Sequence, residues 1–461
     1  MIHVTVHFPI LVGILLALGS APSFSQEKYR VFDLVNISRD LKDLPHIEPF
    51  IAVNPINAMN IAVASIVFRA DGPSCDILVS TNGGKSWTRR TFLETWLDPW
   101  LAFGRQNEVF FSALKKSNER TPSVVYTSRD GGITWDEGTE VPFFIPDTTV
   151  ADFEPKVSSF DHTSIVVIPG NTVEEDRVLL VGMQGAKLRS GQFITGPFAT
   201  IFNPASKNFN SPRLLITNNV WSNTLNPVVL HDGALGIGYM DFGVDDGQMT
   251  VPISGKRIWW ISSHDNAENF SIPFLISEVR NNVTLPLIAA DTTGGEFRSR
   301  IYSAVDDRAG DTGGVFVRYS SNNGEQWSSA VNVIELAARG SRFANTVIAV
   351  NPFGVVGVAW YDGRNSRDSS TCWDIYFAAS EDGGMTFLPN VRITPATFCT
   401  NVPGNIVRQG SRTTDVSRRW SVGGDYFGLS SDSTGRFHLV WADTRTGVYQ
   451  LWHTKVEVVN N

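Results

Sequence analysis

The sequence predicts an all-β protein folded as a single β-propeller, in which four-stranded antiparallel blades form a closed ring. Two internal repeats carry this prediction, and the composition agrees with it. The chain has 461 residues, more than one hydrophobic core usually holds, so it consists either of several domains or of repeated units. Hydrophobic residues make up 42% of it, 13 residues are Trp and only 18% are charged, as is typical of a globular protein rich in strands.

A short turn motif recurs four times along the chain. Its clearest copy is Ser128–Trp135, SRDGGITW, and the other copies span 80–87, 320–327 and 380–387. A strand-like run precedes each copy, so the motif predicts a hairpin turn in which the third residue accepts backbone N–H groups and glycine supplies a positive φ. The third residues are Asn82, Asp130, Asn322 and Asp382.

A longer repeat predicts the blades themselves. Apolar segments that run into a turn and a second apolar strand begin at Pro49, Pro99, Pro227, Pro286, Thr346 and Tyr426, with a weaker seventh at His162. Because each unit has room for four short strands, we expect seven blades, with six as the alternative. After Tyr426 only three strands fit, so segment 29–38 is expected to complete the last blade and close the ring. Residues 26–461 then form one propeller domain.

Residues 1–25 are predicted to be a signal peptide. An apolar run at 8–19 is followed by small residues up to Ser25, the pattern that a signal peptidase reads. A membrane anchor is the alternative, although the run is short for spanning a bilayer, and no later segment is apolar enough to span one. We therefore expect a secreted, extracellular protein, periplasmic in a Gram-negative source, with no membrane span in the mature chain.

The net charge, the cysteines and the short motifs limit the partners, cofactors and modifications that we expect. The net charge of −8 argues against nucleic acid. Cys372 and Cys399 are predicted to pair because both fall in loops on one face, which leaves Cys75 as an odd thiol. No metal-ligand spacing, phosphate-binding glycine loop or nucleophile elbow is found, so neither a metal nor a cofactor is expected. Asn-x-Ser/Thr sequons, glycosylated only in a eukaryotic source, begin at Asn36, Asn269 and Asn282.

The four turns resemble the Asp-boxes, or bacterial neuraminidase repeats, of the sialidase superfamily, and the longer repeat extends the resemblance over residues 30–461. The motif is specific for Asp-box propellers but not for sialidase activity, since other glycosidases and non-catalytic secreted propellers carry it. The resemblance implies that the turns join the third and fourth strands of a blade, opposite the active site. It also implies a site with three arginines, a tyrosine nucleophile activated by a glutamate, and an aspartate acid/base.

The resemblance, together with the positions of the inner-strand entrances, suggests three catalytic residues. Tyr426 opens the inner strand of the last blade, where the family places its nucleophile, and Glu48 is the carboxylate we pair with it. Asp98 is the acid/base. The alternatives are a tyrosine packed near the central channel and an aspartate that caps a strand. The family's first arginine lies in a Phe/Tyr-Arg-Ile-Pro motif, but this chain has His46-Ile-Glu-Pro49 there.

Arginines on the expected site face are candidate substrate ligands. Three second strands end in an Asp-x-Arg pattern, at 306–308, 362–364 and 443–445, which either surrounds an acidic sugar or ties blades together. The length of the connection from Pro395 to Asp425 indicates a functional loop. This connection carries Arg408, Arg412, Arg418 and Arg419. The substrate-binding candidates are Arg308, Arg364, Arg445, Arg412 and Arg419.

The entrances of the inner strands add His162 as a further substrate-binding candidate and Trp96 as a surface for stacking on a sugar ring. Their alternatives are a structural histidine and a tryptophan packed between blades.

These residues favour a secreted sialidase-like propeller that hydrolyses or binds glycans, with a glycan or glycoconjugate as partner. If it is an enzyme, we expect an exo-acting glycosidase that prefers acidic sugars, working as a monomer. The alternatives are a non-catalytic extracellular propeller that binds a protein or polysaccharide, and a polysaccharide lyase. Sialidase activity requires three arginines converging around Tyr426; engagement of Arg364 and Arg445 by Asp362 and Asp443 would contradict it.

Overall fold

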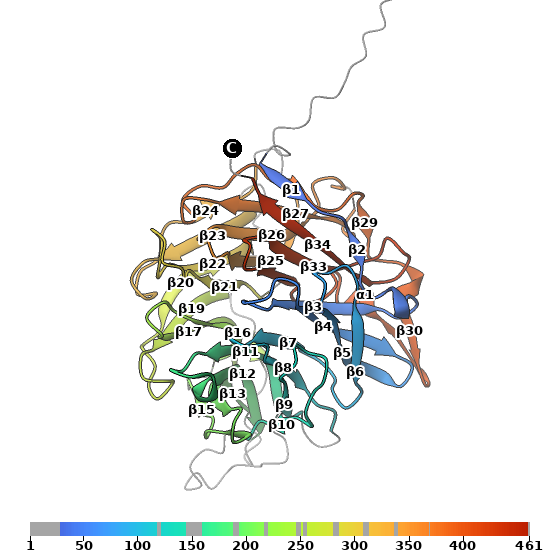
Figure 1. Ribbon diagram of the computed structural model, residues 1–461. Coiled ribbons are helices and arrows are strands. Elements are labelled where there is room, and N and C mark those ends of the chain that lie inside the picture. Colours follow the sequence, from blue (N-terminus) through green and yellow to red (C-terminus); the bar gives the residue numbers. More distant parts are fainter. Residues whose placement is uncertain are drawn as a thin grey trace, which may run out of the picture.

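The computed structural model places seven antiparallel sheets around a central axis (Figure 1). The seven-bladed, all-β propeller predicted from the repeats is thereby confirmed. The structure describes residues 28–117, 121–143, 159–187, 193–215, 220–245, 250–251, 256–279, 285–307, 313–335, 340–367 and 369–459. The predicted signal peptide, the sequon at Asn282 and Arg308 lie outside these residues. No helix within the described ranges is long and apolar enough to cross a bilayer.

Each blade contains four strands, numbered outward from the axis. Blade 1 consists of β3 (His46–Val53), β4 (Ile61–Arg69), β5 (Gly72–Ser80) and β6 (Thr88–Phe92). Blade 2 consists of β7 (Trp100–Phe103), β8 (Val109–Leu114), β9 (Ser123–Ser128) and β10 (Thr139–Glu140). Blade 3 consists of β11 (Ser159–Ile168), β12 (Arg177–Lys187), β13 (Phe193–Asn203) and β14 (Asn208–Phe209), with β15 (Arg213–Leu214) also on β13.

The next three blades follow the same order. Blade 4 consists of β16 (Val220–Val229), β17 (Leu235–Asp245), β19 (Lys256–Ser263) and β20 (Phe274–Val279), with β18 (Thr250–Val251) on β17. Blade 5 consists of β21 (Leu287–Ala290), β22 (Ile301–Asp307), β23 (Gly314–Ser320) and β24 (Val331–Asn332). Blade 6 consists of β25 (Phe343–Val350), β26 (Val356–Asp362), β27 (Cys372–Ser380) and β28 (Val391–Arg392), with β29 (Phe398–Cys399) on β27.

Blade 7 joins the two ends of the chain. Its three C-terminal strands are β32 (Gly428–Ser431), β33 (Phe437–Asp443) and β34 (Gln450–Val458). Its outer strand is β1 (Tyr29–Val31), which pairs with β34 and is followed by β2 (Val35–Asn36) on the same edge. The predicted closure by the N-terminal strand is confirmed, and Figure 1 shows β1 in blue beside strands of the C-terminal region.

The connection between blades 6 and 7 forms a small unit of its own. It contains the two-stranded hairpin β30 (Ile406–Gln409) and β31 (Arg412–Asp415), followed by the helix α1 (Val416–Arg419). Single 3-10 turns lie at Arg39–Leu41, Val173–Glu175 and Pro403–Asn405. The structure joins Cys372 to Cys399 in a disulfide, which fixes the start of the connection to β27, while Cys75 is a buried free thiol.

The four repeated turns lie between the third and fourth strands of blades 1, 2, 5 and 6. In the copy at 128–135, Ser128 Oγ lies 2.8 Å from Asp130 Oδ1 and accepts the Gly132 N–H at 2.9 Å. Asp130 Oδ1 accepts the Thr134 N–H at 2.8 Å, and Trp135 Nε1 donates to the Gly132 carbonyl at 2.8 Å. The Asp130 carboxylate therefore makes its hydrogen bonds within its own turn.

A fifth turn of this kind, at Ser263–Phe270 in blade 4, escaped the sequence analysis. Ser263 Oγ lies 2.9 Å from Asp265 Oδ1 and accepts the Ala267 N–H at 3.0 Å, while Asp265 Oδ1 accepts the Asn269 N–H at 2.8 Å. Asn266 and Ala267 replace the two glycines at φ of 56° and 63°. The hydrogen bonds are conserved between blades although the glycine signal is lost.

Candidate functional site

The inner strands are bulged where they begin, at the end of the axis opposite the turns. Register shifts interrupt the pairing of β3, β11 and β25 with their neighbours just after Ile47, Asp161 and Ala344. The residue at each bulge has a left-handed backbone: φ is 50° at Glu48, 48° at His162 and 51° at Asn345, and it is 55° at Asp98 just before β7. Each such residue costs about 1 kcal/mol or more, and strain of this kind is concentrated at functional sites.

The bulges place polar side chains from separate blades at one end of the axis. The Asp98 carboxylate accepts the His162 N–H at 2.7 Å, and His162 Nε2 lies 3.9 Å from Asp425 Oδ2. Glu48 Oε1 accepts the Asp425 N–H at 3.3 Å. We call Glu48, Asp98, His162 and Asp425 the axial cluster. Glu48 and Asp98 are buried, whereas the side chain of Asp425 is 39% exposed.

The electrostatic environment shifts the acidity of three members of the cluster. Burial, opposed by His162, raises the pKa of Asp98 to about 7. Burial and the neighbouring carboxylates of Asp425 and Asp98 raise the pKa of Glu48 well above its usual value. Burial alone would lower the pKa of His162, but the surrounding carboxylates, chiefly that of Asp98, raise it to about 9. The cluster thus combines two carboxyl groups that hold their protons more tightly than usual with an imidazole that favours its cationic form.

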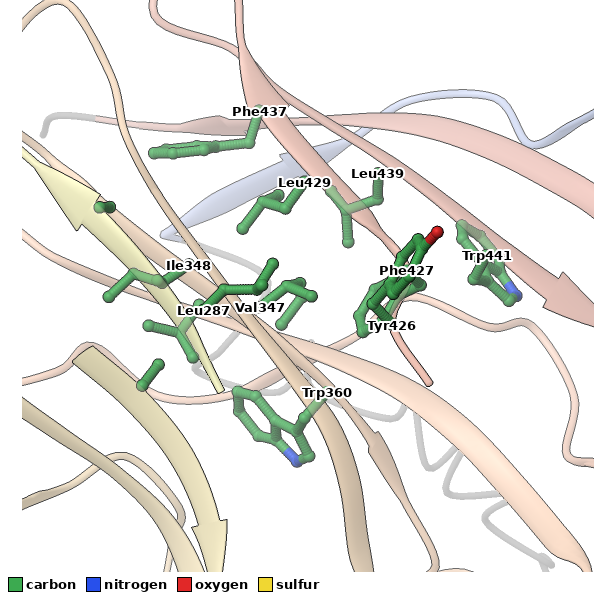
Figure 2. Close-up of a cluster of buried hydrophobic side chains, with 14 of the residues drawn as sticks. Leu287, Val347, Ile348, Trp360, Tyr426, Phe427, Leu429, Phe437, Leu439 and Trp441 are labelled. Carbon is green, nitrogen blue, oxygen red and sulfur yellow. The ribbon is translucent and has the colours of Figure 1, made fainter. Parts of the chain in front are cut away.

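Tyr426 lies beneath the cluster in an apolar setting. Its hydroxyl donates to the Pro99 carbonyl at 3.1 Å, and its ring centroid is 5.4 Å from that of Trp100, which stacks on Phe50. Figure 2 shows Tyr426 among buried side chains of the inner strands, including Leu287, Val347 and Leu429. Burial and the nearby Glu48 carboxyl raise the pKa of its phenol well above the usual value. Among described residues, its hydroxyl bonds to a carbonyl and not to a carboxylate.

Phe50, Trp100 and Tyr426 form an apolar plug below the cluster. A small recess above the plug is lined by polar and apolar side chains. The lining includes Asp98, His162, Trp100, Leu287 and Tyr426. The structure thus brings together the three residues predicted to be catalytic, together with His162.

Arg364 and Arg445 are held by carboxylates of their own blades. Asp362 accepts Arg364 Nη2 at 2.7 Å, and the guanidinium lies 3.9 Å above the Tyr376 ring. Asp443 accepts Arg445 Nε at 2.9 Å, and that guanidinium lies 4.4 Å from the Trp452 ring. Their side chains are only 9% and 18% exposed. This is the engaged arrangement that counts against a three-arginine carboxylate site, and it agrees with the architectural interpretation of the pattern.

Arg412, Arg419 and Trp96 are not members of the axial cluster. Arg412 and Arg419 are exposed on β31 and α1. His46 is fully buried, with Nδ1 2.8 Å from the Leu44 carbonyl, so it supports the chain entering blade 1. Trp96 is 38% exposed at the start of the inner strand of blade 2 and is therefore open to a ligand on one side.

Two polar residues of this face were not singled out as site residues from the sequence. Asp425 was named only as the end of the connection from Pro395, and Asn345, whose side chain donates to the Gly424 carbonyl at 2.9 Å, was not noted at all. A usable signal exists, because a polar residue followed by Pro or Thr opens the inner strand in four blades. The four pairs are Glu48-Pro49, Asp98-Pro99, His162-Thr163 and Asn345-Thr346.

A cation could approach Asp98, Asp161 and His162, whose potential ligand atoms lie within 4.8 Å of one another. A metal requires a neutral imidazole, and the raised pKa of His162 disfavours that form at neutral pH.

No family model and no curated protein matches the chain. Solved structures do match it. A protein of unknown function from Dyadobacter fermentans DSM 18053 has a TM-score of 0.50 at 10% identity, over 94% of this chain and 100% of that one. A Hadza microbial sialidase has a TM-score of 0.46 at 11% identity, over 93% and 92%. The GH93 α-L-arabinofuranosidase of Fusarium graminearum has a TM-score of 0.43 at 13% identity, over 72% and 92%. The resemblance to the sialidase superfamily is confirmed as a likeness of fold.

Proposed function

We propose that the protein is an exo-acting glycoside hydrolase whose catalytic groups belong to the axial cluster. The observation that carries this proposal is the convergence of Glu48, Asp98, His162 and Asp425 from different blades at one end of the axis. Burial raises the pKa of Asp98 to about 7, which suits a group that gives and takes a proton near neutral pH. The Asp425 side chain is 39% exposed, so a second carboxylate is within reach of solvent beside it.

The two carboxyl groups fit the general scheme of glycosidases. Asp98, as a carboxylic acid, donates its proton to the oxygen of the leaving sugar as the glycosidic bond breaks. Asp425, as a carboxylate, stabilises the positive charge that develops on the ring or activates the attacking water. The His162 imidazole, whose pKa is raised to about 9, places a positive charge close to the Asp425 carboxylate, with Nε2 3.9 Å from Oδ2. Glu48 supports Asp425 by accepting its backbone N–H.

The charge of the cluster favours a neutral sugar at the bond that is cleaved. An acidic sugar would need cations close to its carboxylate, and Arg364 and Arg445 are already paired with Asp362 and Asp443. The recess beside Asp98 and His162 is too small to enclose a sugar ring, so a glycan has to approach the cluster from the exposed side of Asp425. Export by the segment at 1–25 remains a prediction.

The test is a substrate screen with two matched variants. Purified protein is incubated with neutral aryl glycosides, neutral oligosaccharides, sialylated glycoconjugates and polygalacturonate, and released sugar is measured. We expect release from a neutral substrate that falls at least about 100-fold in Asp98→Asn. Asp130→Asn is the control, because Asn82 and Asn322 occupy the same position in other turns.

Other outcomes of the screen assign other functions. Free sialic acid lost on Tyr426→Phe would support a sialidase instead, and an unsaturated product absorbing in the ultraviolet would support a lyase. Absence of any product would leave a propeller that only binds.

A further inference from the structure

The connection between blades 6 and 7 concentrates positive charge on an otherwise acidic protein. Residues 400–424 contain four arginines and a single acidic residue, Asp415, whereas the whole chain has a net charge of −8. The arginines lie on the hairpin β30–β31 and on α1, which we call the basic hairpin. They are Arg408, Arg412, Arg418 and Arg419, and all four are exposed.

None of these four arginines forms an ion pair with a residue that the structure describes. Asp415, the one acidic residue in segment 400–424 of the connection, uses Oδ1 to accept the Ser417 hydroxyl at 2.7 Å and the Arg418 N–H at 3.3 Å. Elsewhere in the described chain arginines are commonly engaged, as Arg69 is by Asp76 at 2.7 Å. Four guanidinium groups are thus available to an external anion.

The hairpin is held rigidly, as a binding surface requires. Tyr449 N–H donates to Asn405 Oδ1 at 2.8 Å, Gln409 donates to the Arg69 carbonyl at 3.3 Å, and Val416 is fully buried. The Trp420 ring packs 5.2 Å from that of Phe68 in blade 1. Fixing the backbone in advance lowers the entropy that a partner must supply on binding.

The hairpin lies on the same face as the axial cluster. The connection starts beside the disulfide of Cys399 and ends at Gly423, whose carbonyl accepts the Glu48 N–H at 2.8 Å. Gln409 reaches Arg69 at the β4–β5 end of blade 1, which is also on that face. A polymer lying on this face can therefore contact the arginines while its end lies at the axial cluster.

We propose that the basic hairpin binds uronate groups of an acidic polysaccharide whose end is presented to the axial cluster. This inference rests on the proposed glycan-acting function and names its substrate class: a heteropolymer with carboxylates along the chain and a neutral residue at the cleaved bond. Guanidinium groups suit this task because their planar forks match carboxylates. A nucleic acid carries charge at a higher density along its whole length and is therefore repelled more strongly by a chain whose net charge is −8.

The experiment measures binding to polygalacturonate at low and moderate salt. The test variant carries Arg408→Gln, Arg412→Gln, Arg418→Gln and Arg419→Gln. A control that removes two positive charges elsewhere carries Arg129→Gln and Arg298→Gln, two exposed arginines away from the hairpin. We expect the wild type and the control to bind alike, more weakly as salt rises, and the test variant to bind roughly ten- to a hundredfold more weakly. Thermal unfolding checks that all variants are folded.

Three results would overturn the proposal: no binding to polygalacturonate, equal binding by the test variant, or binding to phosphatidylserine vesicles or duplex DNA in preference to it. Binding is measured without turnover and is expected to survive Asp98→Asn. Loss of the hydrolase proposal and loss of the hairpin proposal are therefore separate outcomes.

Discussion

The two ends of the propeller axis differ in which features are repeated from blade to blade. At the turn end, five blades build the same hydrogen-bonded turn from nearly the same residues. At the opposite end, four blades repeat one backbone feature, a left-handed residue where the inner strand begins, but the side chain changes from Glu48 to Asp98, His162 and Asn345. A feature repeated in every detail serves the architecture, whereas a repeated backbone with differing side chains makes an asymmetric site.

The turns also act between blades. An added Cβ at Gly84, Gly132 or Gly324 would lie 2.6, 2.9 or 2.1 Å from a side chain of the preceding blade, namely His453, Val79 or Trp260. These glycines are therefore required both by their positive φ and by close packing. The turn end determines the spacing of the blades on which the axial cluster depends.

Disturbing the spacing of the blades should have the largest effect on the free energy of unfolding. Gly324 and Gly447 have nearly equal φ, 87° and 88°, but only Gly324 faces a neighbouring side chain, because an added Cβ at Gly447 meets nothing within 4 Å. Gly324→Ala should lower the free energy of unfolding by about 3 kcal/mol and Gly447→Ala by about 1 kcal/mol. Denaturant unfolding of both variants measures the difference, and equal losses would show that backbone strain alone matters.

The junction between blades 7 and 1 should weaken in acid. His438 and His453 are buried with ring nitrogens 3.1 Å apart, and His438 Nε2 lies 3.1 Å from Asp432 Oδ2. Burial, reinforced by His438 and Lys455, holds the pKa of His453 well below its usual value. The unfolded chain therefore binds a proton below about pH 6.5 that the folded chain excludes, and stability falls as pH falls, by about 2 kcal/mol at pH 5.

Denaturant unfolding of His453→Gln at pH 7.5 and pH 5 tests this expectation. Between pH 7.5 and pH 5, the free energy of unfolding of the variant should fall by about 2 kcal/mol less than that of the wild type. An unchanged difference would show that other groups control the acid sensitivity.

At the opposite end, the proposed activity should depend on the proton of Asp98. Its pKa is raised to about 7, so the acid form is lost as pH rises above that value. We expect kcat/KM to fall about tenfold for each pH unit above the pKa. A pH profile measured on a neutral substrate is the check, and a constant rate up to pH 9 would remove Asp98 as the proton donor.

The smallest effect should come from the fifth turn. Asp265→Ala and Asp130→Ala each remove the acceptor of the same backbone N–H groups, so each should cost about 1 kcal/mol of unfolding free energy and leave activity unchanged. A loss in Asp130→Ala alone would mean that the turn in blade 4 is not equivalent to the others.

The fold was predictable because its signals are local. A turn such as 128–135 closes its hydrogen bonds within eight residues, so its sequence reports its structure directly. One turn was missed. The turn at 263–270 keeps the serine and the aspartate, but Asn266 and Ala267 stand in place of both glycines and adopt the positive φ. A pattern that requires glycine misses it.

The candidate site was predictable only in part. Tyr426 and Glu48 were named from the family resemblance, and Asp98 and His162 from their positions at inner-strand entrances. The structure brings the four residues together. Whether Arg364 and Arg445 reach a ligand was left open by their spacing, because an Asp-x-Arg pattern allows both a local ion pair and a free guanidinium.

By itself, the sequence determined the repeated strands and turns and the closure by segment 29–38, since each depends on neighbouring residues or on the count of strands. Only the tertiary structure decided which polar groups share a microenvironment. Asp98 and Asp425 are separated by 327 positions in the chain, yet each affects the pKa of Glu48, because the ring brings the starts of the inner strands to one axis.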